Sequence, residues 1–578
     1  MKKRNLFLFI PLTFTLLGLT SVETKDEKTD LTAYLNRIKR EIWVDSVFNT
    51  FSEEDKIAQL FFAAAYSNRS KAEEDAVSNL IKKHHIGGLV FFQGSPTKQA
   101  ELTNRYQTES NVPLMIAMDA EWGLGMRLDS TISFPYQMAL GATSEDNLIY
   151  EMGAEIAQQF KRIGMHINFA PVADVNNNAN NPVINYRSFG EDKVKVAQKA
   201  YAYMKGMQDN GLITSAKHFP GHGDTDVDSH YGLPVIKHSR ERLEDIELYP
   251  FKELINKGLN GIMVAHMNIP VLDNTPNLPT TLSQPVITNL LRNDLGFKGL
   301  VFTDAMNMKG VTSFHPAGEA EVKALLAGND IMELSENIPK AIEAIKSAVK
   351  QGVIQQESIN EKCKKVLTAK YDLGLAKWEK INLNNLNQDL NNEKAKTLNL
   401  QLSAATLTLL KNEENLLPLK SIEKQAIAVL SIGSDSFTAL QNKANEFAKI
   451  EAFSLPSTVN NTSIQKVKSK LKKFDIVIVG LHDTQKRPNN KIEYSADLQS
   501  FIGELAQNPK SVIVVLKNPY TLAKFKNIDK AKQLIMMYYD CKNAQEVAIN
   551  FIFGKGFATG KMPVSVGKFK AGEGIEVK

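Results

Sequence analysis

The sequence has little cysteine, no basic stripe and, after its first residues, no long hydrophobic run. Its two cysteines, Cys363 and Cys541, are too few for a disulfide framework or a four-cysteine zinc site. Whether they form a single bridge depends on a distance that a sequence does not contain. The formal net charge is only +5, and no basic cluster with interleaved aromatic residues occurs, so we expect no nucleic acid as a partner.

The N-terminus is the one strongly hydrophobic part of the chain. Met1–Asn5 is positively charged, residues 6–19 are almost entirely apolar, and small residues follow. This order is typical of a secretory signal peptide, and the apolar run is shorter than the roughly 20 residues of a transmembrane helix. We therefore predict a signal peptide over residues 1–21, export to a periplasm or out of the cell, and no membrane association after its removal. An uncleaved anchor is the alternative.

The rest of the chain has an ordinary globular composition and is long enough for at least two domains. Residues 22–50 predict a polar helical lead-in. Between residues 51 and 375, apolar runs alternate with amphipathic helical stretches such as 70–84 and 240–258, which favours a parallel sheet covered on both faces. Eight such runs predict an α/β fold of the (β/α)8 TIM-like barrel type, with an open doubly wound sheet as the alternative. The runs are 57–65, 86–92, 113–119, 166–174, 212–218, 261–267, 299–306 and 329–334.

A second domain is predicted after a polar connection. Residues 376–399 are rich in asparagine and lysine, which indicates a linker leading into a helix. From 400 to 578, apolar runs again alternate with helical stretches, so we predict a smaller C-terminal α/β sandwich domain. Its runs are 406–413, 425–433, 474–482, 511–518 and 533–540.

Polar residues gather where the predicted barrel strands end. The carboxyl ends of barrel strands form the face that carries the active site. The residues at or just after these ends are Asp119, Asp174, Lys217, His218, His266, Asp304 and Glu333.

The segment KHFPGHGDTDVDSH, residues 217–230, holds three of the ten histidines. It has enough ligands for a metal ion, but it lacks HExxH and HxH spacing and the glycine and final glutamate of a calcium loop. Asp228 stands two residues before His230, where a carboxylate can fix the imidazole tautomer and raise its basicity. A metal site is therefore disfavoured. A general acid/base at His230 competes with a plain surface histidine, and the position of the loop after a strand that ends in Lys217 and His218 weakens the second interpretation. Gly221 and Gly223 make the backbone permissive, as in a loop that moves over a substrate.

The same segment resembles the signature of glycoside hydrolase family 3, in its β-N-acetylglucosaminidase branch. Other segments resemble the family in the same order, so that the resemblance covers nearly the whole chain after the signal peptide. These segments are EDKIAQLFF (54–62), MDAEWGLGMRL (118–128), FAPVADVNNNANNPVINYRSFGED (169–192), VFTDAMNM (301–308), LTLLKNEENLLPL (407–419) and GKMPVSV (560–566).

The resemblance implies a retaining exo-β-N-acetylglucosaminidase that needs no metal or other cofactor. Its substrate would be an amino-sugar oligosaccharide such as a peptidoglycan fragment. Asp304 would be the nucleophile that forms a covalent glycosyl-enzyme, His230 the acid/base, and Asp228 the residue that orients His230. The sugar-binding residues would be Asp119, Arg127, Arg187, Lys217 and His218.

Five further residues receive a weaker interpretation. His222 and Asp224 are expected to shape the loop, His266 to support a strand end, and Glu333 to be a candidate for the pocket wall. Trp122 stands where the family usually has glycine, and we expect it to narrow the pocket edge or to stack on a sugar face.

Other functions stay open at this stage. From the residues alone, Asp304 also fits a helix N-cap, and Arg127 and Arg187 also fit salt bridges. A β-N-acetylglucosaminide phosphorylase is one alternative, because a histidine acid/base does not repel phosphate as a carboxylate would. A β-glucosidase of the same family, a catalytically inactive carbohydrate-binding protein and a metallohydrolase are the others. The sequence does not indicate an oligomeric state.

Overall fold

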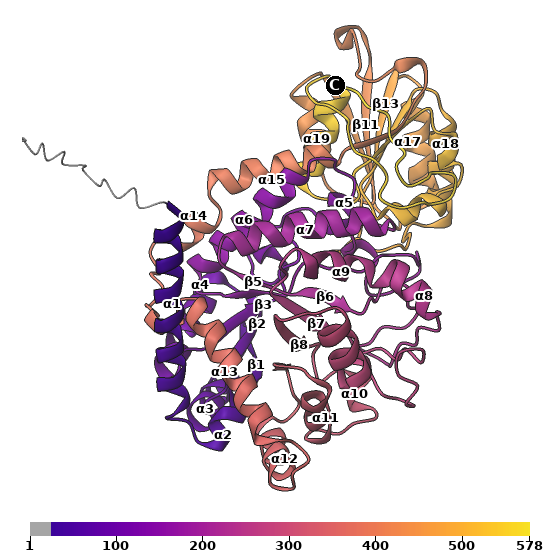
Figure 1. The fold of residues 1–578 in the computed structure, drawn as a ribbon. Helices are drawn as coiled ribbons and strands as arrows, with labels where there is room; N and C mark the ends of the chain where they lie inside the picture. The colour runs from indigo at the N-terminus through magenta and orange to yellow at the C-terminus, as the bar shows by residue number, and fades with distance from the viewer. Residues whose placement is uncertain (1–24) are drawn as a thin grey trace, which may run out of the picture.

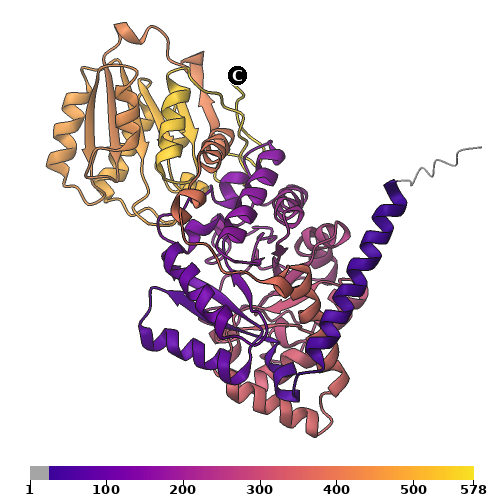
Figure 2. The same cartoon turned by 90° about the vertical axis from the view of Figure 1, so that its left-hand side faces the viewer.

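The computed structural model describes residues 25–578, and the predicted signal peptide lies outside them. The first described element is α1, Lys25–Phe48, which runs along the side of the barrel domain beside α13, Gln356–Asp372 (Figure 1, Figure 2). Within the described residues, no helix combines the length and the apolar character needed to cross a bilayer.

The barrel has eight parallel strand positions, and each predicted apolar run supplies one of them. The strands are β1 Phe61–Ser67, β2 Gly88–Gly94, β3 Met115–Met118, β4 Ile167–Asn168, β5 Ile213–Thr214, β6 Ala216–Phe219, β7 Gly261–Val264, β8 Leu300–Thr303 and β9 Met332–Glu333. β5 and β6 together occupy one strand position of the barrel and are separated only by Ser215. Most of the runs are largely apolar because both faces of the sheet are covered, and every residue of β3, β7 and β8 is buried.

The ring closes completely. β4 pairs with β5, and β6 pairs with β7. The interrupted strand β5–β6 therefore joins a six-stranded sheet to a three-stranded one. On the other side, β8 meets β9 through a parallel bridge between Phe302 and Ile331, and β9 pairs with β1. The barrel prediction is therefore confirmed, and the alternative of an open doubly wound sheet is wrong.

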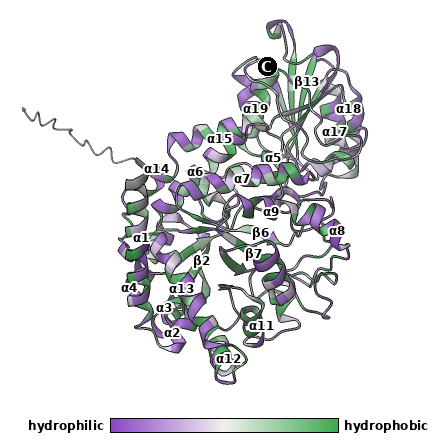
Figure 3. Ribbon diagram, viewed as in Figure 1, coloured by the Kyte–Doolittle hydropathy of each residue, from purple (hydrophilic) through white to green (hydrophobic). Residues whose placement is uncertain are grey.

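Helices cover the outside of the ring, and Figure 3 shows hydrophobic strands inside and hydrophilic residues on the outer helix faces. Ser70 starts α3, Lys71–His84, by a reciprocal capping box with Glu73. The helix expected over 240–258 is divided into α8 Arg240–Arg242, a π-helical segment Leu243–Glu247 and α9 Tyr249–Asn256. Further helices are α2 Glu53–Ala58, α4 Pro96–Glu109, α6 Asp146–Arg162, α7 Lys193–Asp209, α11 Glu319–Ala327 and α12 Ile338–Lys350.

The C-terminal domain is a six-stranded sheet between helices, which confirms the predicted sandwich (Figure 1). Its strands, in spatial order, are β10 Thr408–Asn412, β15 Gln533–Met536, β14 Ser511–Val515, β13 Ile476–Leu481, β11 Ile427–Ile432 and β12 Ile450–Leu455. Only β10 runs antiparallel to its neighbour. Its main helices are α16 Ala439–Asn445, α17 Asn461–Leu471, α18 Ala496–Gln507 and α19 Lys542–Ile552.

The connection between the domains is docked on the barrel. It contains α14, Leu386–Leu390, and α15, Glu393–Thr406, which runs through the boundary expected near residue 400. Arg162 holds it, donating from Nε to Asp389 (2.8 Å) and from its two terminal nitrogens to backbone carbonyls at positions 382 (2.6 Å) and 384 (2.7 Å). The cysteines, both within the described chain, are free thiols in different domains.

The two domains meet at the carboxyl ends of their sheets. Asn176, beyond β4, donates from Nδ2 to the hydroxyl of Tyr520 (2.7 Å). Asn518, beyond β14, donates from Nδ2 to the side-chain oxygen of Asn185 (2.5 Å). The barrel helix α5, Gln137–Leu140, packs into the hydrophobic core of the C-terminal domain. The second domain therefore covers part of the barrel face that carries the predicted site.

Candidate active site

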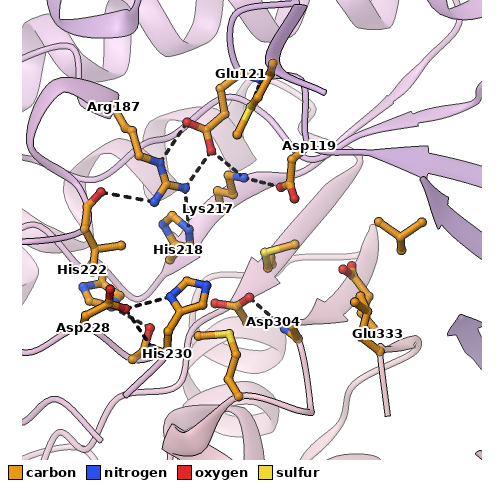
Figure 4. A pocket seen from close by; sticks show the side chains of 18 of the residues that line it. Asp119, Glu121, Arg187, Lys217, His218, His222, Asp228, His230, Asp304 and Glu333 are labelled. Carbon is orange, nitrogen blue, oxygen red and sulfur yellow. Dashed lines mark hydrogen bonds and ion pairs between the residues drawn. The ribbon is translucent and has the colours of Figure 1, made fainter. Parts of the chain in front are cut away.

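The predicted site residues lie together in one cavity of about 360 Å³ at the carboxyl ends of the barrel strands (Figure 4). Its size is within the range of small-ligand pockets. The barrel loops form most of the wall, and a loop of the C-terminal domain contributes Arg487. All eight residues predicted for catalysis or sugar binding line it, namely Asp119, Arg127, Arg187, Lys217, His218, Asp228, His230 and Asp304.

Asp119, directly after β3, is held by two cations. Lys217 donates from Nζ to Oδ1 (2.7 Å), and Arg127 donates from its guanidinium to Oδ2 (2.6 Å). Burial alone would raise the pKa of Asp119, but Lys217 and Arg127 hold it well below its ordinary value. The carboxylate stays ionised, and each oxygen keeps acceptor capacity for a ligand hydroxyl.

Glu121 extends this ion network, a role that the sequence reasoning did not assign. It is fully buried and accepts two hydrogen bonds from Arg187, at 3.0 and 2.7 Å, while Lys217 Nζ lies 2.9 Å from Oε1. Burial raises the pKa of Glu121, but Arg187 and Lys217 lower it to about 2. Its position in the D-x-E part of the quoted segment 118–128 was the available signal.

Asp174, beyond β4, organises the beginning of the loop 217–230. Its carboxylate accepts from the backbone N–H groups of His218 (3.2 Å) and His222 (2.7 Å) and contacts Nδ1 of His218 (2.7 Å). His222 is buried, and burial together with His218 lowers its pKa to about 4. Nδ1 of His222 contacts the hydroxyl of Thr225 at 2.8 Å. At neutral pH, His222 is therefore an uncharged part of the loop.

Asp228 and His230 form the pair that their spacing predicts. Oδ1 of Asp228 accepts from the backbone N–H of His230 (2.9 Å) and contacts its Nδ1 (2.7 Å). This contact leaves Nε2 for the substrate. The His230 side chain is 62% exposed, so protons can exchange with solvent. Figure 4 shows its ring between Asp228 and Asp304.

The other acids of the loop turn to separate partners. Asp224 contacts Nε2 of His238 (2.9 Å), and Asp226 accepts from the side-chain amide of Asn178 (2.7 Å). Across residues 25–578, no three His, Cys, Asp or Glu side chains are grouped as ligands of one ion. The acids at 224 and 226 thus hold the loop to its neighbours.

Asp304, directly after β8, faces the cavity, and its Oδ1 accepts from the backbone N–H of Ala305 (2.8 Å). Burial alone would raise its pKa, but His266, His218 and this N–H lower it below the ordinary value. The ionised carboxylate is the form that acts as a nucleophile. His266 is buried near Asp304. Its Nδ1 contacts the hydroxyl of Thr281, and its Nε2 contacts the carbonyl oxygen of Ala305 (3.0 Å).

Trp122 forms part of the wall and is only 4% exposed. Its ring packs edge-on against Tyr136, with centroids 4.6 Å apart, and lies near Tyr186. The guanidinium of Arg487 lies 5.5 Å from the Trp122 ring. Arg487 lies in the loop between β13 and α18, and no motif in the sequence marked it as a site residue.

Chemically, the cavity combines an ionised carboxylate, an imidazole paired with a second carboxylate, and a buried ion network. The first two can attack an electrophilic carbon and protonate the departing oxygen. The network can bind hydroxyl groups of a polar ligand.

Comparison with known proteins finds the same two-domain arrangement along nearly the whole chain. Residues 52–369 match the glycosyl hydrolase family 3 N-terminal domain, and residues 407–573 match the C-terminal domain of that family. β-Hexosaminidase A of Pseudoalteromonas piscicida is 28% identical over 552 residues, covering 85% of this chain and 91% of that protein. A β-N-acetylglucosaminidase/β-glucosidase of Cellulomonas fimi is 24% identical over 554 residues, covering 90% and 95%. The structure of a family 3 β-N-acetylglucosaminidase from Paenibacillus sp. strain FPU-7 has a TM-score of 0.76 and 28% identity, covering 90% of this chain and 99% of that one.

Proposed function

Since the chain belongs to glycosyl hydrolase family 3, as its motifs indicate, and is a glycoside hydrolase, we propose that it is an exported retaining exo-β-N-acetylglucosaminidase. The observation that carries the proposal is the Asp228–His230 pair in the same cavity as Asp304. The names of the relatives support the choice of sugar, since they are a β-hexosaminidase, a β-N-acetylglucosaminidase/β-glucosidase and a β-N-acetylglucosaminidase.

In the first step, a carboxylate oxygen of Asp304 attacks the anomeric carbon. The bond from that carbon to the leaving oxygen breaks, and His230 gives this oxygen its Nε2 proton. The products are a covalent glycosyl-enzyme and a free alcohol. Asp228 stabilises the protonated imidazole beforehand and fixes the ring orientation through Nδ1.

In the second step, His230 takes a proton from a water molecule whose oxygen attacks the same carbon. The bond to Asp304 breaks, and the sugar leaves with its original anomeric configuration. The histidine returns to its protonated form, so the cycle consumes only water.

The shape of the cavity supports action at a chain end. The network of Asp119, Lys217 and Glu121 lines it and can bind the polar groups of a terminal sugar, and the interior of such a barrel is filled by side chains. Export rests on the pattern of residues 1–21, and an exported enzyme acting on amino sugars would meet peptidoglycan fragments.

The test is hydrolysis of p-nitrophenyl β-N-acetylglucosaminide beside the corresponding β-glucoside. We expect preferential release from the amino sugar, abolished by Asp304→Ala and strongly reduced by His230→Ala. Asp435→Ala is the control, because Asp435 is exposed in the C-terminal domain and lies outside the cavity wall. Preferential cleavage of the glucoside, or full activity of Asp304→Ala, would contradict the proposal. A glycosyl phosphate formed in phosphate buffer would replace it with phosphorolysis.

A further inference from the structure

Glu333 is a buried carboxyl group that the mechanism above does not use. It is the last residue of β9, is 2% exposed and lines the cavity. Its backbone N–H donates to the hydroxyl of Thr303 (3.0 Å), which fixes the strand end. Figure 4 shows the side chain turned into the pocket that Asp119 and Asp304 also line.

One oxygen of the Glu333 carboxyl group is buried without a partner in the described part of the chain. Among the described residues, nothing forms a hydrogen bond with its buried Oε1. Buried polar atoms in folded proteins are nearly always paired, so an unpaired one in the wall of a ligand cavity points to the ligand as its partner.

Its surroundings favour the neutral acid. Burial, and then the carboxylates of Asp119 and Asp304, raise the pKa of Glu333 well above its ordinary value, and Lys217 offsets only part of this. A protonated carboxyl group donates one hydrogen bond and also accepts. An uncharged hydroxyl group of a ligand matches it, whereas an anionic ligand group would meet two carboxylates nearby.

We propose that Glu333 is a specificity-determining residue whose carboxyl group hydrogen-bonds a hydroxyl group of the sugar held beside Asp304. This inference rests on the proposed function, because it requires a sugar in the cavity. A sugar that lacks this hydroxyl, or carries it in the opposite configuration, leaves the carboxyl group unpaired again. Sites built to bind a substrate hydroxyl reject such analogues strongly.

Two substitutions separate hydrogen bonding from other roles. Glu333→Gln keeps a donor and an acceptor at the same place, so we expect kcat/KM on p-nitrophenyl β-N-acetylglucosaminide to stay within about threefold of wild type. Glu333→Leu removes both, and we expect a loss of about 10- to 100-fold. Thermal unfolding of each variant shows whether it is folded, and Leu places no polar atom in the buried wall.

Deoxygenated substrates identify the contact. The 3-, 4- and 6-deoxy analogues are assayed with wild type and Glu333→Leu as a double-mutant cycle across enzyme and substrate. We expect the removal of one hydroxyl group to lower kcat/KM strongly with wild type. The same removal should lower kcat/KM only slightly with Glu333→Leu, which has already lost the hydrogen bond. If all three analogues lose the same factor with both enzymes, Glu333 does not contact a sugar hydroxyl and the proposal is wrong. Glu247→Gln, at a buried glutamate outside the cavity, should leave the wild-type pattern unchanged.

The remaining outcomes are also decisive. If Glu333→Gln is as slow as Glu333→Leu with p-nitrophenyl but both recover with a 2,4-dinitrophenyl leaving group, Glu333 is an acid catalyst and the proposal is overturned. Absence of turnover in wild type would instead contradict the proposed function. Calorimetric binding of N-acetylglucosamine to wild type and Glu333→Leu then tests Glu333 without turnover, and a chain that binds no such sugar overturns both proposals.

Discussion

At the residue scale, neighbouring groups favour opposite protonation states for Asp304 and Glu333, two carboxyl groups of the cavity. Imidazoles and a backbone N–H favour the ionised form of Asp304, whereas burial and two carboxylates favour the neutral form of Glu333. Two carboxyl groups of one pocket are thereby suited to different tasks. His222, with a pKa of about 4, is uncharged at neutral pH, whereas the His230 side chain is 62% exposed to solvent.

The role of His230 can be tested through the leaving group. General acid catalysis contributes about 10²–10⁴ in rate, and it matters most when the departing oxygen is basic. We expect His230→Ala to lower kcat by a factor in this range on a disaccharide, and far less on a 2,4-dinitrophenyl glycoside. Asp228→Asn should show the same dependence in weaker form. An equal loss on both substrates would show that His230 does not protonate the leaving group.

A second residue-scale prediction concerns stability. Lys370 is fully buried, its Nζ donates to the side-chain oxygen of Gln59 (2.6 Å), and burial lowers its pKa from 10.5 to about 7. Between these values the unfolded chain binds a proton that the folded chain lacks. The free energy of unfolding should therefore rise with pH between about 7 and 10.5, by up to about 1.4 kcal/mol per pH unit from this group.

Urea unfolding of wild type and Lys370→Met at pH 7, 8 and 9 measures this contribution. The loss of the Gln59 partner is independent of pH, so it cancels from the slope. We expect the wild-type stability to rise more steeply with pH than that of the variant. Parallel slopes would mean that Lys370 keeps its proton in the folded protein.

At the element scale, most of the strands that the sequence reveals are buried on both faces, although the edge strand β10 was also predicted. Most barrel strands lie in largely apolar runs, because helices cover one side and the packed interior the other. β12 escaped prediction because it is an edge strand, and four of its six residues keep partly exposed side chains. Site residues that follow strand ends, such as Asp119 and Asp304, were predictable for the same reason. Arg487 was not, because its place in the cavity depends on how the second domain docks.

The loop 217–230 shows a different use of glycine from the one expected. Gly223 lies so close to the backbone of Val175 that an added Cβ would be 1.8 Å from the carbonyl oxygen. At this position glycine permits close packing of the loop against the strand-end segment beyond β4, in addition to any freedom to move.

We therefore expect Gly223→Ala to displace the loop that carries Asp228 and His230. Overpacking of this kind costs about 1–3 kcal/mol of stability, and kcat/KM should fall about tenfold or more. Gly232→Ala is the matched control, because a Cβ there would meet only Val227 at 3.5 Å. Thermal unfolding and kinetics of both variants decide the matter. Equal behaviour of the two would show that the close approach at Gly223 has no consequence.

At the scale of the whole molecule, the two domains share packing as well as a site. Met138 and Ala139 of the barrel belong to the hydrophobic core of the C-terminal domain, and Asn176 and Asn518 form hydrogen bonds across the interface. Because the C-terminal core is not complete without residues of the barrel domain, we expect one cooperative unfolding transition in calorimetry. Two separated transitions would show that the interface contributes little to stability.

The central claim is that Asp304 forms a covalent bond to an N-acetylglucosamine unit in this cavity. The most direct test is mass spectrometry of the protein after incubation with a 5-fluoro derivative of N-acetylglucosaminyl fluoride, which forms the glycosyl-enzyme faster than water removes it. We expect one added sugar on the peptide that contains Asp304, and none with Asp304→Ala. A label on another residue such as Glu333, or no label on an active enzyme, would contradict it.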